Sequence, residues 1–103
     1  MSEITQSLPT LNALRARRDG ILAIAERYGV SNVRVFGSVA RGEATPGSDV
    51  DLLLDLPPHF SLLKLSSLVQ DLRDLLGFPV QVTSAAHLRD ELRPYILRDA
   101  QPL

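Results

Sequence analysis

Phe36-Gly37-Ser38-Val39-Ala40-Arg41-Gly42 and, after a polar loop, Ser48-Asp49-Val50-Asp51-Leu52-Leu53-Leu54 are the two segments that decide the fold of this chain. Apolar residues lead into the Gly-Ser pair, and a second apolar run follows the two aspartates. The residues between the segments, 43–47, are typical of a turn. We therefore predict a strand, a Gly-Ser bend with a short helical turn, a loop and a second strand.

The two aspartates, Asp49 and Asp51, are two positions apart at the start of the second strand. Side chains alternate across a strand, so both carboxylates are expected on one face. Mg²⁺ prefers such oxygens and takes its other ligands from water and substrate phosphates. Gly37 lets the backbone approach a phosphate, and Ser38 adds a hydroxyl near a helix start. The Gly-Ser bend alone is typical of an ordinary turn, and the aspartate pair alone is typical of a strand edge. Together they indicate a metal and phosphate site.

The family resemblance is carried by Gly37-Ser38, ten further residues and then Asp49-Val50-Asp51. This spacing resembles the signature of the DNA polymerase β-like nucleotidyltransferase superfamily. The fuller pattern, Gly-Ser-x-Ala-Arg-Gly and then Ser-Asp-x-Asp-Leu, resembles the minimal nucleotidyltransferases of bacteria and archaea. The resemblance covers nearly the whole chain. It implies an α/β fold in which helices pack on a small mixed sheet, the polymerase β-like palm, with its active face at the strand carrying the aspartates.

The resemblance also implies an activity, which is the Mg²⁺-dependent transfer of AMP from ATP to a hydroxyl. In this family the acceptor can be a tyrosine of a HEPN-type toxin, and the nucleotidyltransferase is its antitoxin. The implied catalytic and metal-binding residues are Asp49 and Asp51, with a two-ion Mg²⁺ site allowed. The implied nucleotide-binding residues are Gly37, Ser38, Arg41 and Ser48. From the residues alone, Arg41 could instead hold the loop by an ion pair, and for Ser48 we favour a bond to the loop backbone.

A third carboxylate is usual in the superfamily, on the next strand. Alignment of residues 77–83 with the pattern Gly-x-x-Val-Asp-Leu-Val places Gln81 at that position. Glutamine can offer a carbonyl oxygen to a metal but cannot take up a proton as a carboxylate does. Loss of a positioned general base typically costs about 10²–10⁴-fold in rate. The alternative function is therefore a weak or inactive nucleotide-binding antitoxin that neutralises its partner by binding, unless Asp55 or the substrate supplies the base.

The composition limits the remaining choices. We expect one domain over residues 1–103, with residues 1–9 as a loose leader. The net charge of −1 makes nucleic-acid binding unlikely and leaves a polymerase fragment a remote option. The chain has no cysteine, no apolar signal region and no run of membrane-spanning length, so we expect a cytoplasmic protein without membrane association. A homo-oligomer or hetero-oligomer stays open.

The flanking segments predict further helices and strands by their periodicity and by their glycine and proline stops. Tyr95 and three arginines near the end, Arg89, Arg93 and Arg98, suit either solvent or a partner, with solvent as the default. Pro94 should kink or restart the last helix. The predicted elements are a helix over 11–28, strands over 33–36, 49–56 and 79–82, a helix over 60–76 and a final helical segment from 84.

Overall fold

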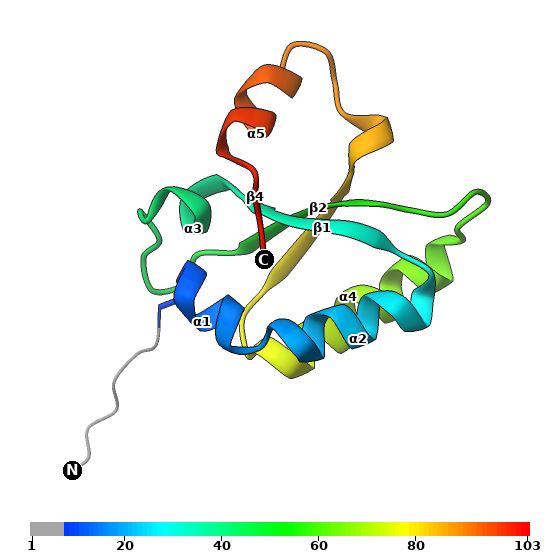
Figure 1. Ribbon diagram of the computed structural model, residues 1–103, viewed down its shortest axis with the longest axis horizontal. Coiled ribbons are helices and arrows are strands. Elements are labelled where there is room, and N and C mark those ends of the chain that lie inside the picture. The colour runs from blue at the N-terminus through cyan, green and yellow to red at the C-terminus, as the bar shows by residue number, and fades with distance from the viewer. Residues whose placement is uncertain (1–7) are drawn as a thin grey trace.

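The computed structural model describes residues 8–103 (Figure 1). The predicted leader lies mainly outside these residues, and Pro9 at its end is fully buried. In the described part of the chain, no helix combines the length and apolar composition needed to cross a membrane. The elements, in chain order, are α1 (Leu11–Ala16), α2 (Arg18–Tyr28), β1 (Ser31–Phe36), α3 (Gly37–Arg41), β2 (Val50–Asp55), α4 (Leu62–Leu76), β3 (Val80–Ser84), the 3₁₀ turn η1 (Ala85–His87), α5 (Arg93–Asp99) and β4 (Gln101–Pro102).

The strands form one mixed sheet in the order β3-β2-β1-β4. β1 runs antiparallel to β2 and β4, whereas β2 and β3 are parallel. Asp51 of β2 lies in register with Phe36 of β1 and with Gln81 of β3. The small mixed sheet packed with helices, predicted from the family resemblance, is confirmed. The register places one aspartate and the glutamine side by side at the same end of the sheet.

One face of the sheet carries the main core. Val35 and Leu52 are paired in register on this face and fully buried. α2 and α4 pack against each other and cover this face, on the lower side of the strands in Figure 1. Each buried aliphatic side chain contributes about 1.5–3 kcal/mol. The helices contribute Ile21, Ile24, Ala25, Leu68 and Leu72 to this core, and the strands add Val33, Val50, Leu54 and Val80.

The opposite face carries the polar residues, because side chains alternate along each strand. Asp51 and Gln81 lie there, together with Leu53, which is fully buried but does not belong to the main core. η1 and α5 lie on this side: η1 packs against β2, and α5 packs against α3 and β1. Figure 1 shows α5 on the side of the strands away from α2 and α4. The candidate site is thus bordered by α3 and by the C-terminal segment.

Two features of the structure differ from the sequence prediction. The single predicted helix over 11–28 is wrong, because the chain turns at Arg17 (φ −108°, ψ 17°) between α1 and α2. Residues 15–19 have no large apolar side chain, so no packing holds a straight helix there. β4 was not predicted at all, because a two-residue strand has no periodicity, and it pairs with the free edge of β1. Pro94 lies in the first turn of α5, so it restarts the helix.

Candidate functional site

The turn from β1 into α3 lies against a carboxylate. Gly37 has φ +76°, a left-handed conformation that side chains disfavour. A Cβ atom on Gly37 would lie 2.5 Å from Oδ2 of Asp51, so any other residue would require the Asp51 side chain to move. Ser38 follows in the first turn of α3 and is half-buried. The structure therefore brings the Gly-Ser bend and the second aspartate together.

The two aspartates lie close enough to interact. Asp51 is half-buried in β2, and burial is the main cause of a raised pKa for this carboxyl. The negative charge of Asp49 raises the same pKa further, while Arg41 lowers it. The pair therefore concentrates negative charge beside the Gly37 backbone, and this charge would be offset by a bound cation.

Gln81 has a direct contact with this pair. Its Nε2 donates a hydrogen bond of 3.1 Å to Oδ2 of Asp49. A carboxylate at this position would have no proton to donate and would repel Asp49 instead. The position that the resemblance assigns to a third carboxylate is therefore inside the site, and its amide stabilises the charge of a neighbouring acid.

Arg41 and Ser48 both make contacts within the fold. The guanidinium of Arg41 bonds to Glu43 (2.9 Å) and to Asp99 of α5 (2.7 Å), and these bonds raise the pKa of Arg41. The ion-pair role is thus present, and a phosphate contact stays a prediction. The Ser48 hydroxyl accepts a hydrogen bond of 2.8 Å from the backbone N–H of Thr45, which closes the loop before Asp49. This is the contact favoured from the sequence, and nucleotide binding by Ser48 also stays a prediction.

Asp55 does not join the site. It lies at the other end of β2, four residues from Asp51, which corresponds to about 13 Å along a strand. Its carboxylate accepts a hydrogen bond of 3.3 Å from Asn32 and lies 4.0 Å from the Arg34 guanidinium. Asp55 therefore cannot replace the missing third carboxylate, and that suggestion from the sequence is wrong.

The residues present fit a metal ion that is shared with a substrate. Across residues 8–103, no group of three or more His, Cys, Asp or Glu side chains could enclose a metal. Asp49 and Asp51 supply two carboxylates, and Mg²⁺ commonly completes such a set with water and phosphate oxygens. The donor set thus suits Mg²⁺ bound together with a nucleotide better than Mg²⁺ bound by the protein alone.

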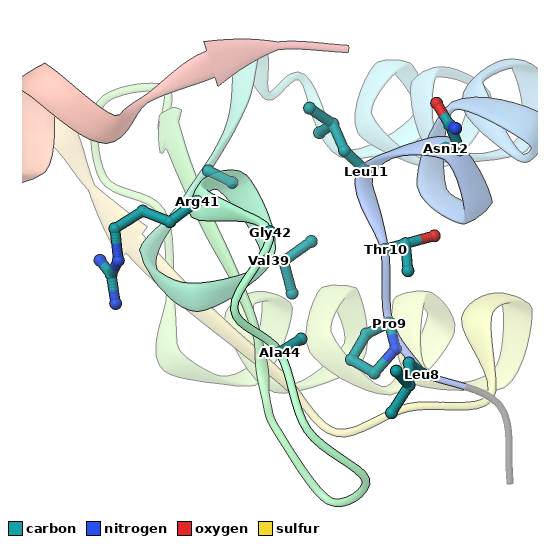
Figure 2. Close-up of a pocket in the computed structure, with 10 residues that line it drawn as sticks. Leu8, Pro9, Thr10, Leu11, Asn12, Val39, Arg41, Gly42 and Ala44 are labelled. Atoms are coloured by element: carbon teal, nitrogen blue, oxygen red, sulfur yellow. The ribbon is translucent and has the colours of Figure 1, made fainter.

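A hollow of about 330 Å³ lies between the segment before α1 and the end of α3. Figure 2 shows Val39 and Ala44 on one side of it and Pro9 on the other, while the Arg41 side chain extends away. Neither aspartate lines this hollow, and Arg41 is the one predicted site residue at its edge. It could not be found from the sequence, because it depends on how the segment before α1 packs against α3.

Comparison with known proteins decides the family. Residues 18–102 match the family described as Nucleotidyltransferase domain. The chain belongs to the nucleotidyltransferase domain family. The protein adenylyltransferase MntA of Thermococcus cleftensis is 41% identical over 76 residues, which cover 74% of this chain and 77% of MntA. A Methanocaldococcus jannaschii relative, assigned as a protein adenylyltransferase, is 36% identical over 78 residues, or 76% of each chain.

One solved structure supports the same family, and a second shares the fold. A structure assigned to the minimal nucleotidyltransferases is 46% identical, with a TM-score of 0.80, and the match covers 91% of this chain and 96% of that one. A crystal structure of a toxin–antitoxin with AMP-PNP has a TM-score of 0.70 at 16% identity, covering 82% of this chain and 69% of that chain. The second match shows the fold alone. The minimal nucleotidyltransferase resemblance read from the motif is confirmed.

Proposed function

We propose that this nucleotidyltransferase transfers AMP from Mg²⁺-ATP to a hydroxyl group of a protein partner. The observation that carries the proposal is the contact of Asp51 with the Gly37 bend, with Asp49 beside it. The 41% identity to a protein named protein adenylyltransferase supports the choice of reaction. The acceptor we propose is a tyrosine of a HEPN-type toxin, which makes this chain an antitoxin acting in the cytoplasm.

The chemistry follows from the residues at the site. The backbone at Gly37 and the Ser38 hydroxyl would bind the triphosphate, and Asp49 and Asp51 would hold Mg²⁺ against it. The bound ion would neutralise the phosphate charge that builds up during in-line attack. The acceptor oxygen bonds to the α-phosphorus while the bond from this phosphorus to the bridging oxygen of the β-phosphate breaks. Pyrophosphate leaves, and the hydroxyl proton passes to solvent.

The second candidate is a binding antitoxin that covers its partner and transfers AMP slowly or not at all. The observation in its favour is the hydrogen bond from Gln81 to Asp49. An amide in this place cannot take the proton of the attacking hydroxyl. Because Asp55 lies at the far end of β2, no other carboxylate on that strand replaces it.

The test is the intact mass of a HEPN-type partner after co-expression with this chain. A gain of one or more adenylyl groups supports the transferase, whereas an unmodified, stably bound partner supports the binding antitoxin. The matched control is the Asp49→Asn/Asp51→Asn variant, which keeps the size of both side chains and should abolish labelling from ATP. If that variant labels the partner as well as the wild type does, the site is misplaced.

A further inference from the structure

α5 is a helix that buries none of its residues. Arg93, Ile96 and Asp99, spaced by three, are half-buried and form the side that faces the protein. The remaining residues of the helix are exposed: Pro94, Tyr95, Leu97 and Arg98, which we call the outer face. Tyr95 is 61% exposed and Leu97 42%, and Leu92 just before the helix is 47% exposed. A surface helix normally presents polar residues on its solvent side, so this composition is unusual.

The outer face has the residue types that dominate protein interfaces. Tyrosine and arginine are enriched among the residues that carry most binding energy, and the arginine here lies over the aromatic ring. The guanidinium carbon of Arg98 is 5.4 Å from the centre of the Tyr95 ring, within reach of a cation–π contact. This contact orders two long side chains before any partner arrives, which lowers the entropy that binding must offset.

The inner side of α5 connects directly to the candidate site. Asp99 accepts the 2.7 Å bond from Arg41, the last residue of α3. Just after α5, Gln101 donates a 3.4 Å hydrogen bond to the carbonyl of Ala40. α3 begins at Gly37, whose backbone lies against Asp51. A protein bound to the outer face would therefore lie beside the phosphate and metal site.

A second exposed apolar pair lies elsewhere. Leu62 and Leu63, at the start of α4, are 83% and 81% exposed. They follow the end of β2 that carries Asp55, which is the end remote from the two site aspartates. In Figure 1 the start of α4 lies at the opposite end of the molecule from α3. A protein docked there would not place a hydroxyl at the site, which favours α5.

We propose that the outer face of α5 is the docking surface for the protein acceptor, and that the acceptor presents an apolar pocket with acidic side chains at its rim. The proposal rests on the proposed function. The charge pattern supports an acidic partner. The one acid of α5, Asp99, is already paired with Arg41. The one charged residue of the outer face, Arg98, makes no salt bridge within residues 8–103. Arg89, Asp90 and Glu91, before the helix, make none either.

The experiment compares two double variants of the full chain, each removing two exposed apolar side chains. Tyr95→Ala/Leu97→Ala should weaken binding to the co-expressed HEPN-type partner at least tenfold and raise the KM for it, with the affinity for Mg²⁺-ATP unchanged. Leu62→Ala/Leu63→Ala is the matched control and should leave all three quantities unchanged. Alanine favours helix, so both variants should fold, and circular dichroism checks this. Arg98→Glu should weaken binding more than Arg98→Ala does, because it would repel an acidic rim.

The docking proposal is overturned if partner binding survives the α5 variant, if the α4 variant is the one that weakens it, or if the wild type does not bind the partner. It is also overturned if the α5 variant only converts a dimer of this chain into monomers, since the face would then bind a second copy. The proposed function fails independently. Binding that depends on α5 without AMP transfer would exclude the transferase, and AMP transfer that does not depend on α5 would exclude only the docking surface.

Discussion

Gly37→Ala tests the contact at the centre of the site. The added Cβ would lie 2.5 Å from Oδ2 and 3.3 Å from Cγ of Asp51, well inside van der Waals contact. The backbone of Gly37 is also left-handed, at φ +76°. Alanine must therefore accept an unfavourable backbone conformation, and the Asp51 carboxylate must move away from its place against the bend.

The two costs can be estimated separately. A left-handed conformation costs an alanine about 1–2 kcal/mol. Displacing the Asp51 side chain from its rotamer adds about 0.5–1.5 kcal/mol. The sum is roughly 1.5–3.5 kcal/mol, and in a domain of this size each kcal/mol lowers Tm by about 4–8 °C. Moving Asp51 should also reduce the affinity for Mg²⁺-ATP by tenfold or more, because a predicted metal ligand is displaced. A tenfold loss of affinity corresponds to about 1.4 kcal/mol of binding free energy.

Gly42→Ala is the matched control. Gly42 has φ +74°, and no atom lies within 4 Å of a Cβ built there. This variant should show the backbone cost alone and keep its nucleotide affinity. Urea denaturation followed by circular dichroism gives the free energy of unfolding in a chain that has no tryptophan, and calorimetry gives the affinity for Mg²⁺-ATP. Equal destabilisation by the two variants, with equal affinities, would refute the close contact between the bend and the carboxylate.

Three further variants test the neighbouring contacts. Gln81→Glu replaces the amide that donates to Asp49 over 3.1 Å by a second negative charge. Tm should therefore fall in the absence of Mg²⁺, while Mg²⁺ affinity and AMP transfer should rise. An unchanged Mg²⁺ titration would contradict this. Asp51→Asn should raise Tm at pH 7 in the presence of a chelator, because the raised pKa of Asp51 means that folding disfavours its ionised form. The gain should be lost as the pH falls from this raised pKa to the ordinary aspartate pKa. A gain in Tm that grows in acid would contradict this reasoning. Tyr28→Phe removes the 2.6 Å hydrogen bond to Asp71 that joins α2 to α4, so thermal melts should show a lower Tm with nucleotide affinity unchanged.

The sequence predicted the parts of the site that depend on local chemistry. A strand places residues two apart on one face, and a glycine before a helical turn permits close approach, so the aspartates and the bend could be assigned from their spacing. Their meeting in space follows from the antiparallel pairing of β1 with β2, which sets Phe36 opposite Asp51. β1 and β2 are consecutive strands, and consecutive strands usually lie side by side in a sheet.

The parts that could not be predicted depend on contacts between distant residues. The turn at Arg17 has good helix formers on both sides, and the nearest glycine, Gly20, lies inside α2 rather than at the turn. The attachment of α5 includes an ion pair between residues 41 and 99, and charge pairs at that separation leave no pattern in a sequence. β4 forms because the edge of β1 is free, and its two residues carry no alternation that could be recognised.

Gln81 was predicted from the sequence only in part. Its place in the site was predicted by alignment, but the direction of its amide was not. In the structure the nitrogen faces Asp49, so its carbonyl oxygen could serve a metal only after the hydrogen bond to that carboxylate is broken. The bond is exposed to solvent, so its contribution falls below the range of about 1.5–3 kcal/mol that is typical of hydrogen bonds to charged groups. Metal binding must offset this loss if the amide is to become a ligand. A carboxylate has no such bond to lose, although it would repel Asp49 in the absence of metal. Glutamine at this position therefore stabilises the metal-free protein at the expense of metal affinity, and a glutamate would reverse that balance.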